Sequence, residues 1–108
     1  MPKFITIGYG DRDGYDATAK AVRDAAHAHD AERVRQGDIM GIAGKPVQVR
    51  NHDGAKVKTT SGPYLSSDLP IAGFALVEAP DLSAAIEIAA QSPCAVAHGV
   101  VEVWPLQP

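Results

Sequence analysis

The stretch IAGFALVEAPDLSAAIEIAAQSP, residues 71–93, decides the fold class of this chain. Its first eight residues are apolar at almost every position, which predicts a β-strand over Ile71–Glu78. The next residues place apolar side chains at helical spacing behind an N-cap at Asp81 or Ser83, which predicts a helix that runs to Gln91 and ends at the Ser-Pro pair. A strand followed directly by a helix is typical of mixed α and β domains.

The N-terminal part of the chain predicts the same order. Lys3–Tyr9 (KFITIGY) is rich in β-forming residues and predicts a strand, and the glycine-containing cluster at 10–14 predicts a loop. Asp16–Gln36 contains many alanines and neither glycine nor proline. One helix is expected there, with Asp16 as its N-cap and Gly37 in a left-handed C-terminal cap.

The segment Gly37–Ser61 predicts a β-hairpin. Val47–Arg50 and Lys56–Thr60 are separated by Asn51–Gly54, whose Asp-Gly pair supplies the positive φ angles that a tight turn requires. After the helix that follows residue 80, Ala97–Trp104 predicts a last strand. The order β-α-β(β)-β-α-β predicts a single α+β domain over residues 1–108 with an antiparallel sheet.

Both faces of the strand Ile71–Glu78 are apolar, so both must be covered. Two helices can cover only one face of a four-stranded sheet. We therefore expect a second copy of the chain to pack on the other face, sheet to sheet and with two-fold symmetry. The alternative is that the hairpin folds over the second face of its own sheet.

Composition argues against several classes of protein. Ten basic and thirteen acidic residues give a net charge of -3 with no basic run, so nucleic acid is not an expected ligand. No apolar stretch reaches the roughly 20 residues of a membrane helix or follows a basic start as in a signal peptide. The single cysteine excludes an internal disulfide. A cytoplasmic protein that binds no membrane is expected.

Histidines are the main candidates for chemistry. His27 and His29 lie two apart on a predicted helix and point in different directions, so they cannot share a metal ion, and no metal or cofactor is expected. His27 shares a partly apolar helix face with Val34, which favours a half-buried side chain that is either an acid/base group or a structural histidine. Asp24 and Asp30 flank it one turn away and either tune it or are solvated helix charges. Cys94 has no neighbouring base in sequence and is not expected to be a nucleophile.

Five segments of the chain resemble, in order and spacing, proteins with a YCII-related domain, and more closely the DGPF branch, which is named for an Asp-Gly-Pro-Phe stretch. The resemblance implies a ferredoxin-like α+β domain in a bacterial protein, with sheets that pair into a dimeric α/β-barrel-like assembly. The segments are VQVR (47–50), KVKTTSGPY (56–64), IAGF (71–74), DLSAAIEIAAQSP (81–93) and GVVEVWP (99–105).

The resemblance also implies a histidine–aspartate acid/base pair near the dimer interface, and His27 best matches the histidine. Ser61 stands in place of the family aspartate and Tyr64 in place of the phenylalanine. A serine cannot hold a negative charge against an imidazolium, so Asp68 in the same loop is the substitute candidate. Gly62-Pro63 either fixes the path of the loop or forms a cleft wall that presents its neighbours to a ligand.

Two hypotheses follow. In the first, a homodimer binds a small organic molecule in a cleft between the first helix and the sheet, and His27, assisted by Asp30 or Asp68, transfers a proton in a lyase- or isomerase-type reaction. In the second, the chain is a non-catalytic ligand-binding or protein-interaction module, with the transcription link that sigma-factor association in the family suggests. The candidate ligand-binding residues are Ser61, Gly62, Pro63, Tyr64 and His98.

Overall fold

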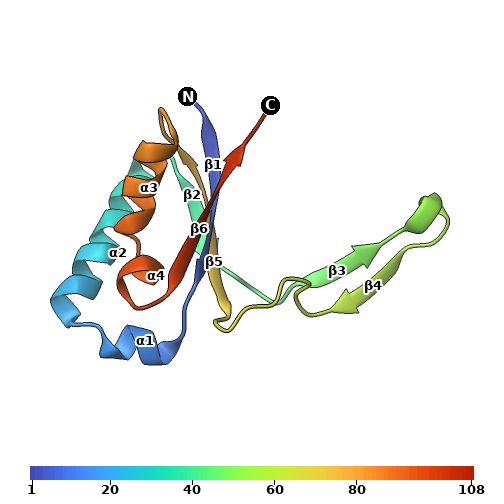
Figure 1. Ribbon diagram of the computed structural model, residues 1–108, viewed down its shortest axis with the longest axis horizontal. Coiled ribbons are helices and arrows are strands. Elements are labelled where there is room, and N and C mark those ends of the chain that lie inside the picture. The colour runs from blue at the N-terminus through green and yellow to red at the C-terminus, as the bar shows by residue number, and fades with distance from the viewer.

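Four antiparallel strands form the main sheet of the structure, a computed structural model that describes all residues from 1 to 108 (Figure 1). Their order is β2-β5-β1-β6, and every neighbouring pair is antiparallel. This order is compatible with a ferredoxin-like fold, and the predicted α+β class is confirmed. The strands are β1 (Lys3–Tyr9), β2 (Ile39–Ile42), β5 (Ile71–Glu78) and β6 (Val100–Leu106).

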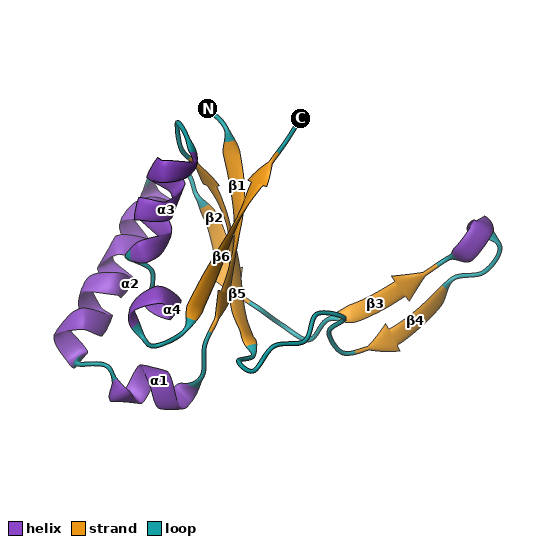
Figure 2. Ribbon diagram, in the orientation of Figure 1, coloured by secondary structure: helices purple, strands orange, loops and turns teal.

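Four helices lie on one side of this sheet (Figure 2). The centre of the core is formed where Phe4 of β1 and Val77 of β5 pack with Ala85 of the helix layer. Phe4 and Val77 are opposite each other in the strand register, so their side chains share the face that the helices cover. The helices are α1 (Arg12–Ala17), α2 (Lys20–Arg35), α3 (Leu82–Ala90) and α4 (Pro93–Val96).

The prediction of one helix over Asp16–Gln36 is wrong, because two helices meet at Thr18. Asp11 is the N-cap of α1: its Oδ1 accepts a hydrogen bond from the Gly14 amide at 2.9 Å. The cluster predicted as a loop therefore forms the first turn of α1. The Thr18 hydroxyl donates to the Gly14 carbonyl at 2.8 Å, and the extended backbone of Thr18 ends the helix.

The C-terminus of α2 is fastened to the sheet. Gly37 has a φ of 109°, as its predicted role in a left-handed cap requires. Arg33, in the last turn of α2, donates from Nε to Asp38 Oδ2 at 2.7 Å and from Nη2 to the Glu78 carbonyl at 3.3 Å. This buried ion pair joins the helix to the start of β2 and the end of β5.

The second helical segment also differs in detail from its prediction. Asp81 is the N-cap of α3, since its Oδ1 accepts from the Ala84 amide at 2.8 Å, which excludes the alternative cap at Ser83. The short helix α4 follows where a simple stop was expected. The last strand begins at Val100 and not at Ala97, because His98 adopts a φ of 63° that no strand allows.

The predicted hairpin is present as β3 (Val47–Arg50) and β4 (Lys58–Ser61), which form a separate two-stranded sheet. The turn contains the expected positive φ angles, 61° at Asp53 and 68° at Gly54. We call residues 45–64 the arm. The arm leaves the main sheet between β2 and β5 and stands away from it (Figure 1), so the alternative in which the hairpin covers its own sheet is wrong.

The arm gives the molecule an extended shape of 52 × 35 × 21 Å. The radius of gyration is 15.7 Å, whereas a compact chain of this length has a value of about 13 Å. Only 11 of the 108 residues are buried, so the core is thin for a domain of this size. Much of the apolar surface that the sequence supplies therefore stays exposed.

The face of the sheet opposite the helices has no cover. Strand alternation and register place Ile5, Ile7, Phe74, Leu76 and Trp104 together on it, and we call this the open face. Phe74 is 47% exposed and Trp104 is 55% exposed. Large apolar side chains at this exposure on one contiguous face mark an interaction surface.

Gly99 gives a test of the fold next to α4. A Cβ at this position would lie 2.1 Å from the Tyr9 carbonyl oxygen, whereas a Cβ at Gly44 would meet nothing within 4 Å. Gly99→Ala should therefore lower the free energy of unfolding by about 2–4 kcal/mol, and Gly44→Ala should change it by less than about 0.5 kcal/mol. Urea unfolding followed by circular dichroism measures both. Equal stability of the two variants would contradict the close approach of Gly99 to Tyr9 of β1.

Candidate functional site

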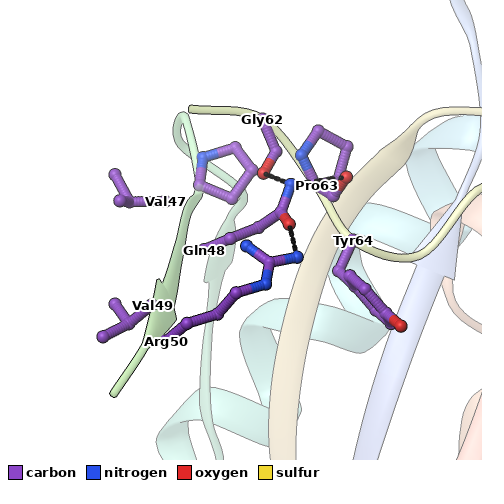
Figure 3. A pocket seen from close by; sticks show the side chains of 8 residues that line it. Val47, Gln48, Val49, Arg50, Gly62, Pro63 and Tyr64 are labelled. Carbon is purple, nitrogen blue, oxygen red and sulfur yellow. Dashed lines mark hydrogen bonds between the residues drawn. The ribbon is translucent and has the colours of Figure 1, made fainter. Parts of the chain in front are cut away.

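A groove of about 400 Å³ lies at the base of the arm (Figure 3). Both sides of the groove come from the arm: β3 supplies one, and the turn after β4 supplies the other. Gln48 and Arg50 are two apart on β3 and therefore share one face of that strand. Their side chains point toward the turn, whereas Val47 and Val49 point away (Figure 3). The lining residues are Pro46, Val47, Gln48, Val49, Arg50, Gly62, Pro63 and Tyr64.

Gln48 holds the two sides of the groove together. Its Nε2 donates to the carbonyl of Gly62 at 3.2 Å and to that of Pro63 at 3.4 Å. Its Oε1 accepts from Nη2 of Arg50 at 2.8 Å. The Arg50 guanidinium carbon lies 5.9 Å from the centroid of the Tyr64 ring, within cation–π range. Gln48 is thus a positioning residue that sets the place of Arg50 against Tyr64.

The groove lies in a cationic region of an otherwise acidic protein. The arm contains four lysine and arginine side chains and one carboxylate, a net charge of +3, although the whole chain has a net charge of -3. Arg50 makes no ion pair, and its cross-strand partner is another cation, Lys58. Like charges placed opposite each other on a hairpin repel, so this pair costs stability and raises the local potential.

The structure brings together only part of the predicted ligand-binding set. Gly62, Pro63 and Tyr64 line the groove. Ser61 is the last residue of β4 and lies next to the groove without lining it. His98 lies between α4 and β6 and contributes nothing to this groove.

His27 is exposed on α2, so the expected half-buried position against the sheet is wrong. Its Nε2 lies 3.0 Å from the hydroxyl of Tyr15 on α1, and this is its one side-chain hydrogen bond. The histidine that faces the fold is His29, whose Nε2 lies 3.0 Å from the carbonyl oxygen of Ile88 on α3. The reason is the helical repeat. Ala26 is the buried residue of α2, and His29, three residues later, lies on the same face of the helix.

The predicted acid/base partners of His27 are not in contact with it. Asp30 is half-buried on α2, and Asp68 is exposed in the loop before β5. No hydrogen bond or ion pair joins either carboxylate to a histidine. Burial raises the pKa of Asp30, and the neighbouring His29 and His27 act in the opposite direction. The three side chains therefore do not form an assembled catalytic group in the single chain.

Cys94 lies beside Asp30 and is packed against β1. A Cβ at Gly8 would come within 2.9 Å of its Sγ. Burial raises the pKa of the Cys94 thiol, and the charge of Asp30 raises it further. A thiol with a raised pKa is a poor nucleophile at neutral pH, in agreement with the sequence-based expectation.

Tyr9 and Glu102 form a polar pair at one end of the open face that the sequence analysis missed. The Tyr9 hydroxyl donates a hydrogen bond to Glu102 Oε1 across β1 and β6. This bond, followed by burial, raises the pKa of Tyr9. The signal in the sequence was weak, because the two residues are 93 positions apart and only the strand register brings them together.

Gln48 and Arg50 were also missed as site residues. Their shared face on β3 could have been read from the alternation of VQVR, but nothing in that pattern shows what the face meets. No three histidine, cysteine or acidic side chains are grouped closely enough to hold a metal ion. No helix has the length and apolar character needed to cross a membrane.

Asp30 and Asp24 on α2 give a matched test of the electrostatics. Burial raises the pKa of Asp30, so its charged form disfavours folding above the ordinary carboxyl pKa near 4. Asp30→Asn should therefore gain stability relative to the wild type as the pH rises from 4 to 7. The pKa of Asp24 is lowered by its bond to Lys20, so Asp24→Asn should lose stability relative to the wild type as the pH rises toward about 4, and the difference should stay constant above about pH 5. Thermal unfolding from about pH 2 to pH 7 measures both. The same pH dependence of stability in the two variants would contradict the assignment.

Comparison with known proteins agrees with the resemblance found in the sequence. The family model described as YCII-related domain matches residues 3–108, nearly the whole chain. A search of curated proteins finds no match. The narrower DGPF branch stays a prediction. The fold and the extent of this match lead to one conclusion: the chain belongs to the YCII-related domain family.

Proposed function

We propose that this protein is a homodimeric module that binds a small organic molecule in the groove at the base of the arm. The observation that carries the proposal is the convergence of Gln48, Arg50 and Tyr64 on one hollow of about 400 Å³. This volume lies in the usual range of small-molecule sites, and a few fixed polar groups beside apolar surface are typical of them.

A second copy is the proposed cover of the open face. Face-to-face packing of two such sheets would remove Phe74 and Trp104 from water and give the dimeric barrel-like assembly expected from the family resemblance. Charge supports the same partner, because the arm has a net charge of +3 and the rest of the chain has an excess of acidic groups. The arm of one copy is therefore attracted to the body of another.

The groove favours binding over catalysis. Its polar side chains are an arginine, a glutamine and a tyrosine, and none of them is a base near neutral pH. His27 is exposed and has a hydroxyl and no carboxylate as its hydrogen-bond partner, which favours a binding module over an acid/base pair. We place the module in the cytoplasm, since its one thiol is half-buried and unpaired and fits a reducing compartment.

A second candidate function is proton transfer at α2. The observation that favours it is Asp30, whose pKa is raised by burial while the nearby His29 and His27 act on its charge. A carboxyl group with a raised pKa is suited to acid/base work. In this hypothesis a ligand or a second copy completes the group, with Asp68 of the loop before β5 as the further carboxylate. The lyase- or isomerase-type reaction expected from the sequence would occur here and not in the groove.

The dimer predicts a clear result for the open face. Phe74→Lys should convert the dimer to a monomer in light scattering, because it buries a charge in the interface. Ile86→Lys on α3 is the matched control, since Ile86 is 51% exposed but lies in the helix layer. If Ile86→Lys dissociates the protein and Phe74→Lys does not, the interface lies elsewhere. The fluorescence of Trp104, the only tryptophan, should shift to the red in the monomer.

A fragment screen by NMR distinguishes the two candidate functions. Ligands of the groove should shift the backbone amide signals of Gln48, Arg50 and Tyr64, and the shifts should disappear in Tyr64→Leu. Ligands of the second candidate should shift the signals of Asp30 and His27 and should be lost in Asp30→Asn. Fragments that move only the α2 signals would overturn the groove as the functional site.

A further inference from the structure

We infer that the groove at the base of the arm recognises a planar organic anion, of which an aromatic carboxylate is the simplest representative. The inference rests on the proposed binding function and goes further by naming the class of ligand. It depends on three properties of the groove: the free donors of Arg50, the absence of a counter-charge, and the exposed ring of Tyr64.

Arg50 keeps most of its donors open, whereas three acceptors of the groove each accept one hydrogen bond already. A guanidinium has five N–H groups, and Arg50 uses one of its nitrogens for Gln48. The carbonyls of Gly62 and Pro63 already accept from Gln48 Nε2, and Gln48 Oε1 already accepts from Arg50. A ligand therefore meets mainly N–H donors in a planar fork, which matches the two oxygens of a carboxylate.

No acidic side chain lines the groove, so the charge of Arg50 is not neutralised there. Lys58 lies directly across the hairpin from Arg50. Lys56 lies two residues before Lys58, just ahead of β4. An anion bound between the strands and the turn would relieve the repulsion of Arg50 and Lys58. A cation would be repelled, and a neutral molecule would leave the charge unpaired.

Tyr64 supplies a surface for a flat group. Its side chain is 81% exposed, and its ring lies beside the Arg50 guanidinium in Figure 3. An aromatic or conjugated ring can stack on Tyr64 while its carboxylate reaches Arg50, because the two groups are 5.9 Å apart. Pro63 extends this apolar surface on the turn. The groove thus selects both for negative charge and for planarity.

Benzoate, benzamide and inorganic phosphate separate these two requirements. Each is titrated into the full-length ¹⁵N-labelled protein, and the amide signals of residues 46–50 and 62–64 give the dissociation constant. Benzoate should bind at least about tenfold more tightly than benzamide, which has the same ring without the charge. It should also bind more tightly than phosphate, which has the charge without the ring.

Two variants of the arm remove one positive charge each. Arg50→Gln should weaken benzoate binding by about tenfold or more, because Arg50 supplies the fork of donors. Lys58→Gln removes a charge from the cross-strand position but does not line the groove, so it should weaken binding by less than about threefold. Unchanged amide spectra outside the arm verify that both variants fold.

The outcomes separate this inference from the proposed function. Equal binding of benzoate and benzamide, with both lost in Tyr64→Leu, would overturn the anion class and leave the groove as a binding site. Undiminished benzoate binding in Arg50→Gln would also overturn it. An equal loss of benzoate affinity in Arg50→Gln and Lys58→Gln would mean that only the net positive charge of the arm attracts the anion. That result would contradict specific recognition by the planar N–H donors of Arg50. No benzoate-induced shift at tens of millimolar would overturn the inference, while fragments found in the groove would still support the proposed function.

Discussion

The structure depends on a sheet that is apolar on both faces and covered by helices on only one. Phe4 and Val77 anchor the covered face through their contacts with Ala85. Phe74 and Trp104 occupy the other face, where no element of the same chain reaches them. A monomer with this arrangement keeps a thin core, so its stability and its assembly are coupled through a single surface. The free position of the arm is part of the same arrangement, because an arm folded back would have covered that face.

Hydrogen bonds between residues of the arm itself hold the arm in shape. Gln48 connects β3 to the turn at Gly62, and the amide of Gly62 donates to the carbonyl of Pro46 at 3.1 Å. These bonds shape the groove without help from the main sheet. The groove therefore has its geometry before a ligand arrives, which lowers the entropic cost of binding. The free protein is instead destabilised by the repulsion between Arg50 and Lys58, which lie opposite each other on the hairpin.

The sequence predicted those features that depend on local pattern. The strand at Lys3–Tyr9 and the turn at Asp53-Gly54 were correct, and Asp81 was one of the two caps expected for α3, because a few adjacent residues determine each of these features. The break at Thr18 was missed, since no glycine or proline marks it. It results from hydrogen bonds of the Asp11 and Thr18 side chains to the backbone, which compete with a continuous helix.

The candidate site was harder to predict for a physical reason. The faces of α2 are rich in alanine, so the weak apolar spacing favoured His27, whereas His29 is the histidine that faces the fold. Gly62, Pro63 and Tyr64 were found through the family resemblance, whereas Arg50 and Gln48 become site residues only through contacts across the arm. The direction in which the arm leaves the sheet is a tertiary property that no local pattern contains.

The insertion of the arm between β2 and β5 also affects the entropic cost of closing the sheet. Twenty-eight residues separate the end of β2 at Ile42 from the start of β5 at Ile71. If the hairpin closes first through the bond between Gly62 and Pro46, the loop that remains to be closed falls to about half that length. This lowers the entropic cost of pairing the edge strand by roughly 0.6 kcal/mol. A hairpin that contributes nothing to the core thus makes the pairing of β2 with β5 easier to form.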